Sequence, residues 1–393
     1  MKNTIRLFDQ DSHLYTFSAT VLACDEIESG NFRVVLDRTA FFPEGGGQAA
    51  DVGTLAGQPV LDVQEECGVI YHTVTRPLPV DETVDGCLDA DVRLRRMQNH
   101  TGEHIVSGLI HAAYGFDNVG FHLGSEDVTL DFNGVLDRTQ LDEIEDKANR
   151  IVAACLPIKA YYPAPDLLSN MIYRSKLELY ENVRIVEIGD GGSVDRCACC
   201  APHVSNTGEV GIIKLLDFIH YKGGIRIHMH CGLDALEDYR RRYTAIASMA
   251  SEMSVKQADV AEGFARMQAD IAEKKQIINS LREQLLDMKA DALQPVENSL
   301  CLFEEDLDAV GMRRLLNRVT GKCGALCGVF VGNDESGCGY RFVIGRADPS
   351  IDLRARAKEL NTALRARGGG SSEMLQGQSA CTREEIERVF EAL

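Results

Sequence analysis

Two pairs of metal-preferring side chains in this sequence are each separated by four residues. His100 and His104 lie in a segment with helical periodicity, where this spacing places both imidazoles on one face of the helix. Cys199 and His203 repeat the spacing about a hundred residues later. Imidazole nitrogen and thiolate sulfur are donors that Zn²⁺ prefers, and four such groups suit a tetrahedral site. The spacing therefore predicts one zinc ion per chain, bound by His100, His104, Cys199 and His203.

The residues around these pairs leave three questions open. Cys197 and Cys200 lie close to Cys199, which the spacing favours as the thiolate ligand. A zinc ion with four protein ligands is usually structural, whereas catalysis requires an open or displaceable position. The segment HTGEH also matches H-x-x-E-H, a zinc-peptidase pattern in which Glu103 would be the general base. A zinc peptidase is ranked second as a function because it leaves the Cys199 and His203 pair without a role.

The elements that must position these residues are strands and helices. Residues 1–90 contain short β-rich segments, such as "FRVVLDRTAFF" and "GVIYHTVTRPL", separated by turn residues. At Asp91 the pattern changes to that of a helix, "DVRLRRMQNHTGEHIVSGLIHAAYG", which ends at a glycine. Strands and helices then alternate to about residue 240. The first pair of metal-preferring residues is therefore expected on a helix.

A heptad pattern follows this region. Nine residues are spaced 4-3-4-3-4-3-4-3, and eight of them are apolar: Val260, Phe264, Met267, Ile271, Lys274, Ile278, Leu281, Leu285 and Met288. This seam predicts a coiled coil or a long helical hairpin, which Gly263 weakens and Pro295 ends. Because an apolar seam must be buried, we expect a homodimer through the C-terminal half, unless the segment folds back within one chain.

Composition and charge restrict the compartment and the partners. The net charge is -19, yet residues 311–367 carry eleven Lys and Arg against five Asp and Glu, which is compatible with RNA binding at one place. No apolar stretch approaches the roughly 18 residues that a membrane span requires. The N-terminus has no secretion-signal pattern, so the thirteen cysteines are expected as thiols or metal ligands rather than disulfides. We therefore expect a cytoplasmic protein without a membrane partner.

Several motifs together resemble one family. "TAFFPEGGGQAADVG" is similar to the glycine-rich segment of the alanyl-tRNA synthetase editing domain, while "MQNHTGEHIVSGLI" and "CCAPHVSNTGEVG" resemble its two metal motifs. "LGSEDVTLDF" fits the core strands of that domain and "KGGIRIHMHCGLDAL" fits its end. The tail "RARGGGSSEMLQG" is similar to the glycine-rich loop of the DHH-associated C-terminal domain of these synthetases. The resemblance, with no aminoacylation module ahead of it, indicates a free-standing AlaX-type editing protein of the long form.

This resemblance implies a fold and a division of the chain. The expected fold class is α+β, with a small N-terminal β-barrel over 1–90 and a zinc-containing editing domain over 91–240. A helical, coiled-coil arm over 241–295 and a C-terminal α/β domain over 296–393 complete it. The sequence departs from the family at Cys200, Ala201 and Pro202, where small residues usually separate the Cys and His of the second motif.

The resemblance also implies an activity and its residues. The expected reaction is zinc-dependent deacylation of tRNA(Ala) mischarged with serine or glycine; a non-enzymatic tRNA-binding protein with structural zinc is a third hypothesis. The glycine-rich segment implies substrate contacts from Gly45, Gly46, Gly47 and Gln48, and either Gln48 or Glu103 is a candidate catalytic residue. The alternatives are a tight hairpin of glycines with an exposed Gln48, and a Glu103 that is simply an exposed helical glutamate. Expected RNA contacts in the tail are Arg365, Arg367, Gly368, Gly369 and Gly370.

Overall fold

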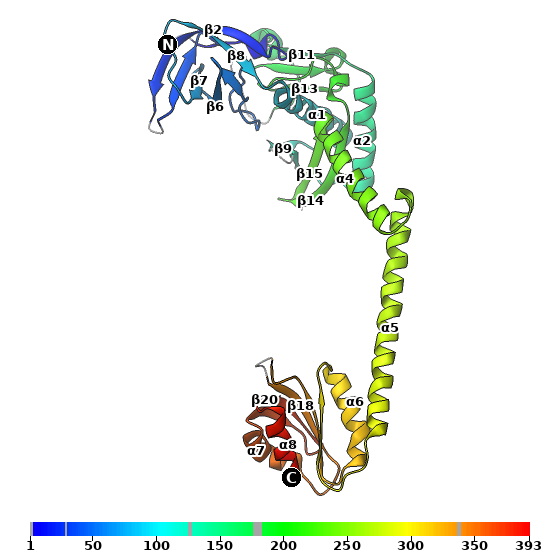
Figure 1. Cartoon of the computed structure of the whole chain (residues 1–393). Coiled ribbons are helices and arrows are strands. Elements are labelled where there is room, and N and C mark those ends of the chain that lie inside the picture. The colour runs from blue at the N-terminus through cyan, green and yellow to red at the C-terminus, as the bar shows by residue number, and fades with distance from the viewer. Residues whose placement is uncertain (1–2, 28–29, 125–127, 176–182, 336–338) are drawn as a thin grey trace. The chain divides into compact units, whose positions relative to one another are not determined.

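The computed structural model describes residues 3–27, 30–124, 128–175, 183–335 and 339–393 (Figure 1). The chain divides into two compact units, Met1–Ser248 and Met249–Leu393. Both mix helices and strands, which confirms the α and β content expected from the sequence. The finer division into four domains stays a prediction. Ser125, Glu126 and Asp127 of the segment "LGSEDVTLDF" lie outside the described residues.

Six strands near the N-terminus close into a barrel. In barrel order they are β2 (Thr16–Glu26), β3 (Phe32–Leu36), β7 (Val69–Val74), β6 (Gln58–Glu66), β5 (Gly53–Leu55) and β8 (Thr83–Leu88). Buried and exposed residues alternate along β8, so one face of the strand enters an apolar core that includes Val34, Leu55 and Ile70. The glycine-rich segment 45–48 lies between β4 (Arg38–Thr39) and β5.

The helix α1 (Ala90–Tyr114) carries the first metal-preferring pair. The Asp89 carboxylate caps it by accepting from the Val92 N–H, and Gly115 ends it with a φ of 69°. Every residue from 97 to 108 is buried, so this helix is surrounded on all sides at its centre. Polar side chains buried there need partners, which is typical of a functional site.

Two sheets and a second helix complete this unit. One sheet has the order β14 (Ile213–Tyr221), β15 (Gly224–Cys231), β10 (Val128–Phe132) and β9 (Asn118–Leu123). Its apolar face shares a core with α1 and with α2 (Arg138–Ala153). The other sheet has the order β11 (Ile158–Tyr161), β12 (Ile185–Ile188) and β13 (Asp195–Ala198). The chain leaves β13 directly into the Cys199 and His203 segment.

The second unit contains a five-stranded sheet with helices on both faces. Its order is β16 (Leu300–Glu304), β17 (Leu326–Val331), β18 (Tyr340–Arg346), β20 (Met374–Ser379) and β19 (Ala366–Gly370). One core includes residues of α7 (Leu353–Ala363) and α8 (Arg383–Glu391), and the other includes α6 (Ala309–Val319) and the end of α5 (Val260–Ala292). The expected glycine-rich loop is therefore wrong, because Gly368, Gly369 and Gly370 form the edge strand β19.

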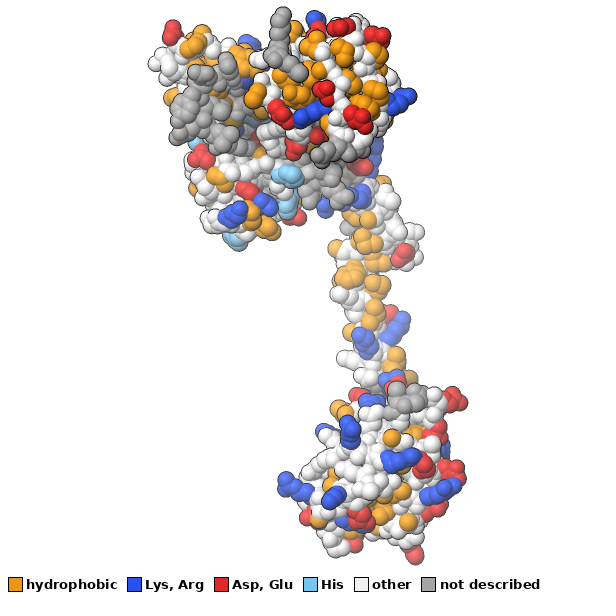
Figure 2. All heavy atoms as spheres, turned by 90° about the vertical axis from the view of Figure 1, so that its left-hand side faces the viewer, with side chains coloured by type: hydrophobic (Ala, Val, Ile, Leu, Met, Phe, Trp, Pro, Cys, Tyr) orange, Lys and Arg blue, Asp and Glu red, His pale blue; other side chains and the backbone are white. Residues whose placement is uncertain are grey.

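The heptad seam lies on a single continuous helix. Helix α5 follows α4 (Gly232–Glu252), and seam residues such as Ile278, Leu281 and Leu285 are about half exposed or more. Hydrophobic side chains are visible along its surface in Figure 2. Leu286 and Ala290, which pack into the core with α6, lie outside the seam. Among the described residues, the alternative of a hairpin that buries the seam is not found.

Within the described ranges, no helix combines the length and the apolar character that crossing a bilayer requires.

Candidate metal centre and its neighbours

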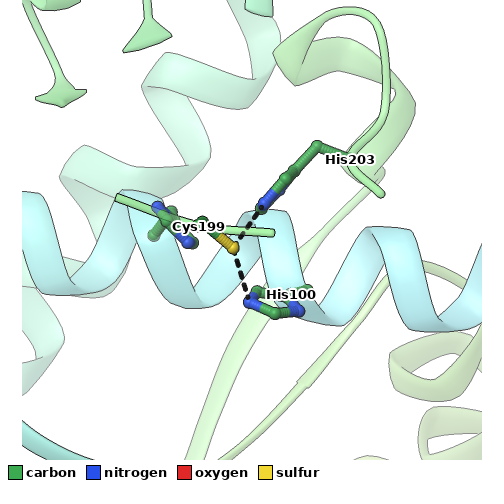
Figure 3. Close-up of side chains that lie close together, drawn as sticks. His100, Cys199 and His203 are labelled. Carbon is green, nitrogen blue, oxygen red and sulfur yellow. Dashed lines mark hydrogen bonds between the residues drawn. The ribbon is translucent and has the colours of Figure 1, made fainter. Parts of the chain in front are cut away.

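The four predicted metal ligands meet inside the first unit. The ring centroid of His203 lies 4.9 Å from that of His100 and 4.7 Å from that of His104. The Cys199 sulfur lies 3.5 Å from His100 Nε2 and 3.4 Å from His203 Nε2 (Figure 3). One ligand atom from each of the four residues lies within 4.8 Å of all the others. The helix α1 and the segment after β13 thus bring together donors that the sequence separates by about a hundred residues.

A second set of residues orients the three imidazoles. His100 Nδ1 donates to Gln48 Oε1 at 2.9 Å, and His104 Nδ1 donates to Asp195 Oδ2 at 3.0 Å. His203 Nδ1 lies 3.0 Å from Thr101 Oγ1. Because each Nδ1 has a partner, each Nε2 is left for a metal ion. Contacts of this kind fix the tautomer and the ring orientation of histidine ligands.

Because the four groups are buried together, a cation between them would stabilise the cluster. Burial lowers the pKa of His203, and the neighbouring His104 and His100 lower it further, so its imidazole is neutral. Burial also raises the pKa of the Cys199 thiol well above its ordinary value. A neutral imidazole is the form that binds a metal, and a cation in the centre would stabilise the thiolate. The donor set, its burial and its fixed orientation therefore fit a metal ion.

Asp195 links the centre to an arginine. Arg174 donates to both carboxylate oxygens, from Nε at 2.7 Å and from Nη2 at 2.8 Å. Burial alone would raise the pKa of Asp195, but hydrogen bonds from His104 and Arg174 bring it below its ordinary value. His104, Asp195 and Cys197 form a second group of potential donors. Asp195 already accepts hydrogen bonds from His104 and Arg174. We therefore interpret it as a residue that orients the His104 ring rather than as a metal ligand.

The glycine-rich segment lies directly against the centre. Gly46 and Gly47 have φ of 62° and 84°, and a Cβ on Gly47 would lie 2.6 Å from the Phe121 carbonyl oxygen. Only glycine fits this turn without strain. Gln48 is 1% exposed and holds the His100 ring, so the alternative of an exposed Gln48 is wrong. Within the described part of the chain, its Nε2 has no hydrogen-bond partner.

Glu103 is buried as well. Its exposed fraction is 2%, which makes the alternative of an exposed helical glutamate wrong. Ser107 Oγ donates to Oε1 at 2.8 Å and Asn118 Nδ2 donates to the same oxygen at 2.6 Å. The other oxygen, Oε2, lies 3.7 Å from His104 Nε2, the nitrogen that faces the centre. The carboxylate is thus fixed beside the predicted ligands.

The sequence did not indicate several residues that hold the centre in place. Asp195 and Arg174 were not singled out, and Thr101 lies within the HTGEH segment without being marked by that pattern as a partner of His203. Arg184 is also buried, and its Nη1 donates to the carbonyl oxygens of Cys199 at 3.2 Å and Ala201 at 2.8 Å. This arginine therefore satisfies the backbone of the segment in which the chain departs from the family pattern. Only the fold brings these partners together, so no local signal pointed to them.

The residues predicted to contact RNA lie in the second unit. Arg365 forms an ion pair with Glu385. Arg367 on β19 is exposed, and among the described residues its side chain has no ion-pair or hydrogen-bond partner. Arg367 pairs with Gln378 of β20, which pairs with Arg341 of β18. Directly opposed residues point to the same face of a sheet, so the two exposed arginines belong to one row.

A comparison with known families matches the part of the chain that carries Cys199 and His203. A family model described as "Threonyl and Alanyl tRNA synthetase second additional domain" matches residues 183–232, which include Cys199 and His203. The alanyl-tRNA editing protein AlaX-L of Pyrococcus horikoshii is 30% identical over 298 residues, which are 73% of this chain and 73% of that protein.

Longer proteins are also similar to this chain. The alanine–tRNA ligase of Halobacterium salinarum is 31% identical over 338 residues, 82% of this chain and 35% of the ligase. The ligase of Archaeoglobus fulgidus is 28% identical over 98% of this chain and 43% of its own length. The chain therefore spans well under half of the ligases that it matches.

Proposed function

Because the chain belongs to the AlaX-type family of alanyl-tRNA editing proteins, we propose that it hydrolyses the ester of tRNA(Ala) mischarged with serine or glycine. The observation that carries the proposal is the convergence of three oriented imidazoles and one cysteine sulfur, two of which, from Cys199 and His203, lie in the matched residues 183–232. Their burial beside a tight glycine turn gives a preorganised site rather than a surface contact.

Accurate use of alanine requires such a reaction. A synthetase pocket for alanine cannot exclude the smaller glycine, and it rejects serine only weakly. One small group in a pocket changes binding by about 1–3 kcal/mol, which is too little for accurate translation. A separate hydrolytic site that removes the wrong amino acid solves this problem.

We propose Zn²⁺ as the metal, one ion per chain, held by His100, His104, Cys199 and His203. When bound, zinc supplies a Lewis acid that polarises a carbonyl or lowers the pKa of water. Gln48 and Asp195 orient the imidazoles, and Gly46 and Gly47 let the backbone approach the ligand closely. The burial of the three histidines separates the centre from bulk solvent.

A deacylation assay tests the function. We expect the protein to hydrolyse Ser-tRNA(Ala) or Gly-tRNA(Ala) faster than Ala-tRNA(Ala), and a zinc chelator to stop the reaction. Restored activity after zinc addition separates metal loss from denaturation. Binding of tRNA without deacylation would overturn the proposal in favour of an RNA-binding protein with structural zinc. Cleavage of peptides without ester hydrolysis would favour a zinc peptidase.

We further propose that the second unit binds the tRNA backbone through the row that contains Arg341 and Arg367. Replacing Arg367 with alanine should weaken tRNA binding and reduce the slope of log affinity against log salt by about 1, as the loss of one phosphate contact does. Filter binding at several salt concentrations measures both. Arg365→Ala is the matched control, since Glu385 already neutralises this arginine. Equal losses in both variants would argue against the assigned surface.

We also propose that the exposed seam of α5 forms a homodimer. Its apolar side chains are not covered in the described chain, and a second copy of the same helix offers a matching seam. Sedimentation of the wild type at micromolar concentration should give a dimer. Ile278→Asp combined with Leu285→Asp should give a monomer, whereas Gln276→Glu, on the face of the helix opposite the seam, should not. A monomeric wild type would contradict this assignment.

A further inference from the structure

Helix α4 (Figure 1) contains a stretch that is exposed on every side. All residues from Tyr239 to Ile246 are exposed, although Ala235, one turn earlier, is buried. Tyr239 is 64% exposed and Tyr243 is 50% exposed. Aromatic side chains contribute strongly to contacts between molecules, and no part of the described chain covers these two. The stretch is therefore a candidate contact surface.

The two tyrosines share one face of the helix, and arginines flank it. Tyr239 and Tyr243 are four residues apart, with ring centroids 6.2 Å apart and ring planes inclined by 31°. Arg240 follows Tyr239 and Arg242 precedes Tyr243, so these two arginines lie on opposite sides of the tyrosine pair. We call the four residues the tyrosine–arginine face.

This face is positively charged on an acidic protein. The segment YRRRY contains three arginines and no Asp or Glu, whereas the whole chain has a net charge of -19. Asp238 pairs with Arg241 at 2.8 Å and with Arg242 at 2.5 Å, so one carboxylate serves two guanidinium groups. Among the described residues, the Arg240 side chain has no ion-pair or hydrogen-bond partner. The charge is complementary to a polyanion.

The beginning of α4 is joined to a neighbour of the predicted metal ligands. Asn99, which precedes His100 on α1, accepts from the Cys231 N–H at 2.8 Å and donates to the Asp234 carboxylate at 2.5 Å. A helix rises about 1.5 Å per residue, so Tyr239 lies about 8 Å along α4 from Asp234. The tyrosine–arginine face is thus within reach of a few nucleotides from the metal centre.

Aromatic rings that alternate with arginines suit a single nucleic-acid strand. Exposed bases stack on aromatic rings, while guanidinium groups contact phosphates and the faces of bases. A second copy of the chain fits this face less well, because a symmetric contact would bring the same arginines together. The end of a tRNA that carries the amino acid is single-stranded, and it must come close to a site that hydrolyses the ester.

We propose that the tyrosine–arginine face binds the single-stranded 3′ end of the tRNA substrate, with bases stacked on Tyr239 and Tyr243 and a phosphate paired with Arg240. This inference rests on the proposed function and deepens it, since it names the part of the substrate that the first unit holds. The two tyrosines and Arg240 bind substrate at a distance from the ester and take no part in its chemistry.

The experiment measures the affinity of the full chain for two uncharged tRNA(Ala) transcripts, one intact and one without its single-stranded 3′ end. We expect the wild type to bind the intact transcript more tightly. Tyr239→Ala combined with Tyr243→Ala should weaken binding of the intact transcript by roughly 10-fold or more, as the loss of base stacking does, and leave the shortened one unchanged. In deacylation, the same variant should raise KM and keep kcat.

Three further variants test the chemistry of the contact. Tyr239→Phe combined with Tyr243→Phe keeps both rings, so it should restore the wild-type affinity. Arg240→Ala should reduce the slope of log affinity against log salt by about 0.7 for the intact transcript alone, as the loss of one single-strand phosphate contact does. Tyr162→Ala is the matched control, because Tyr162 is also about half exposed but lies outside α4 and donates to Asp9 at 3.0 Å.

The outcomes separate this inference from the function on which it rests. Unchanged affinity of the double alanine variant for the intact transcript, or equal losses for both transcripts, would overturn it. If the variant keeps its RNA affinity but sediments as a smaller species than the wild type, the face is a contact with a second copy instead. In each case the wild type still deacylates tRNA(Ala), whereas a wild type without deacylation would overturn the proposed function itself.

Discussion

Replacing His104 with alanine should remove the metal and abolish deacylation. His104 offers Nε2 to the centre while Asp195 and Arg174 hold its other side, so its loss removes one of the four predicted donors and leaves three. A Lewis acid contributes several kcal/mol to a hydrolytic transition state, and its loss should lower kcat/KM by roughly 1000-fold. Metal analysis of the purified variant, followed by deacylation at several enzyme concentrations, measures both consequences.

The same helix provides a control for this experiment. His111 is also a histidine of α1, but it is 47% exposed and pairs with Asp117. His111→Ala should therefore keep both metal and activity. Asp195→Asn should fall between the two, since loss of a partner behind a ligand weakens metal affinity about 10- to 100-fold. Full metal occupancy in His104→Ala would remove this residue from the ligand set.

The helix with the ligands could be predicted closely, whereas its surroundings could not. The periodicity predicted a helix from Asp91 that ends at a glycine, and the structure has Ala90–Tyr114 with Gly115 as its cap. Both ends follow from local chemistry, namely a capping aspartate and a residue that tolerates positive φ. That the centre is buried on every side depends on sheets and a barrel from distant parts of the chain. No window of sequence contains that information.

For the glycines of the tail, local sequence preferences predicted the wrong structure. A local interpretation of Gly368, Gly369 and Gly370 predicted a loop, because glycine disfavours strands. In the structure, a Cβ on Gly377 of β20 would lie 2.6 Å from the Gly368 Cα. The two strands therefore approach so closely that glycine is required, as happens where two backbones meet. Close approach between strands is a tertiary property. The low strand preference of glycine therefore predicted a loop where the chain forms a strand.

In the candidate site, the ligands could be predicted from the sequence and the residues that orient them could not. Spacing and donor chemistry indicated His100, His104, Cys199 and His203, because each pair lies within five residues of the sequence and consists of donors that zinc prefers. The residues that orient them come from separate elements, and their side chains are too common to attract attention. Gln48 and Glu103 could be named as candidates, but only the structure shows that each is buried and what each contacts.

Replacing Arg93 with alanine should cause the largest loss of stability in the first unit. Arg93 lies two turns before His100 on α1 and is 1% exposed. Its Nε donates to Asp51 Oδ2 at 2.9 Å, its Nη1 to the Ser12 carbonyl at 2.9 Å and its Nη2 to the Ala40 carbonyl at 2.6 Å. A single side chain thus joins the ligand-bearing helix to the segments on both sides of the glycine turn.

Without Arg93, the buried Asp51 carboxylate keeps only the more distant of its two arginines, Arg96, whose Nη1 lies 3.7 Å from Asp51 Oδ1, in a medium that solvates charge poorly. Such losses cost about 3–5 kcal/mol of unfolding free energy. For a unit of this size that corresponds to a fall in Tm on the order of 10 °C. Thermal unfolding followed by circular dichroism measures it, and the metal-bound fraction reports whether the centre is disturbed as well.

Two further variants test whether the buried geometry of Arg93 is responsible. Arg93→Lys keeps the charge but cannot reproduce the fork of hydrogen bonds, so we expect an intermediate loss. Arg38→Ala removes an arginine of the same region that is 46% exposed and pairs with Asp37 at 3.0 Å. An exposed pair contributes about 0–1 kcal/mol, so its Tm should change little. Comparable changes in Arg93→Ala and Arg38→Ala would show that the Arg93 network does not hold the barrel to α1.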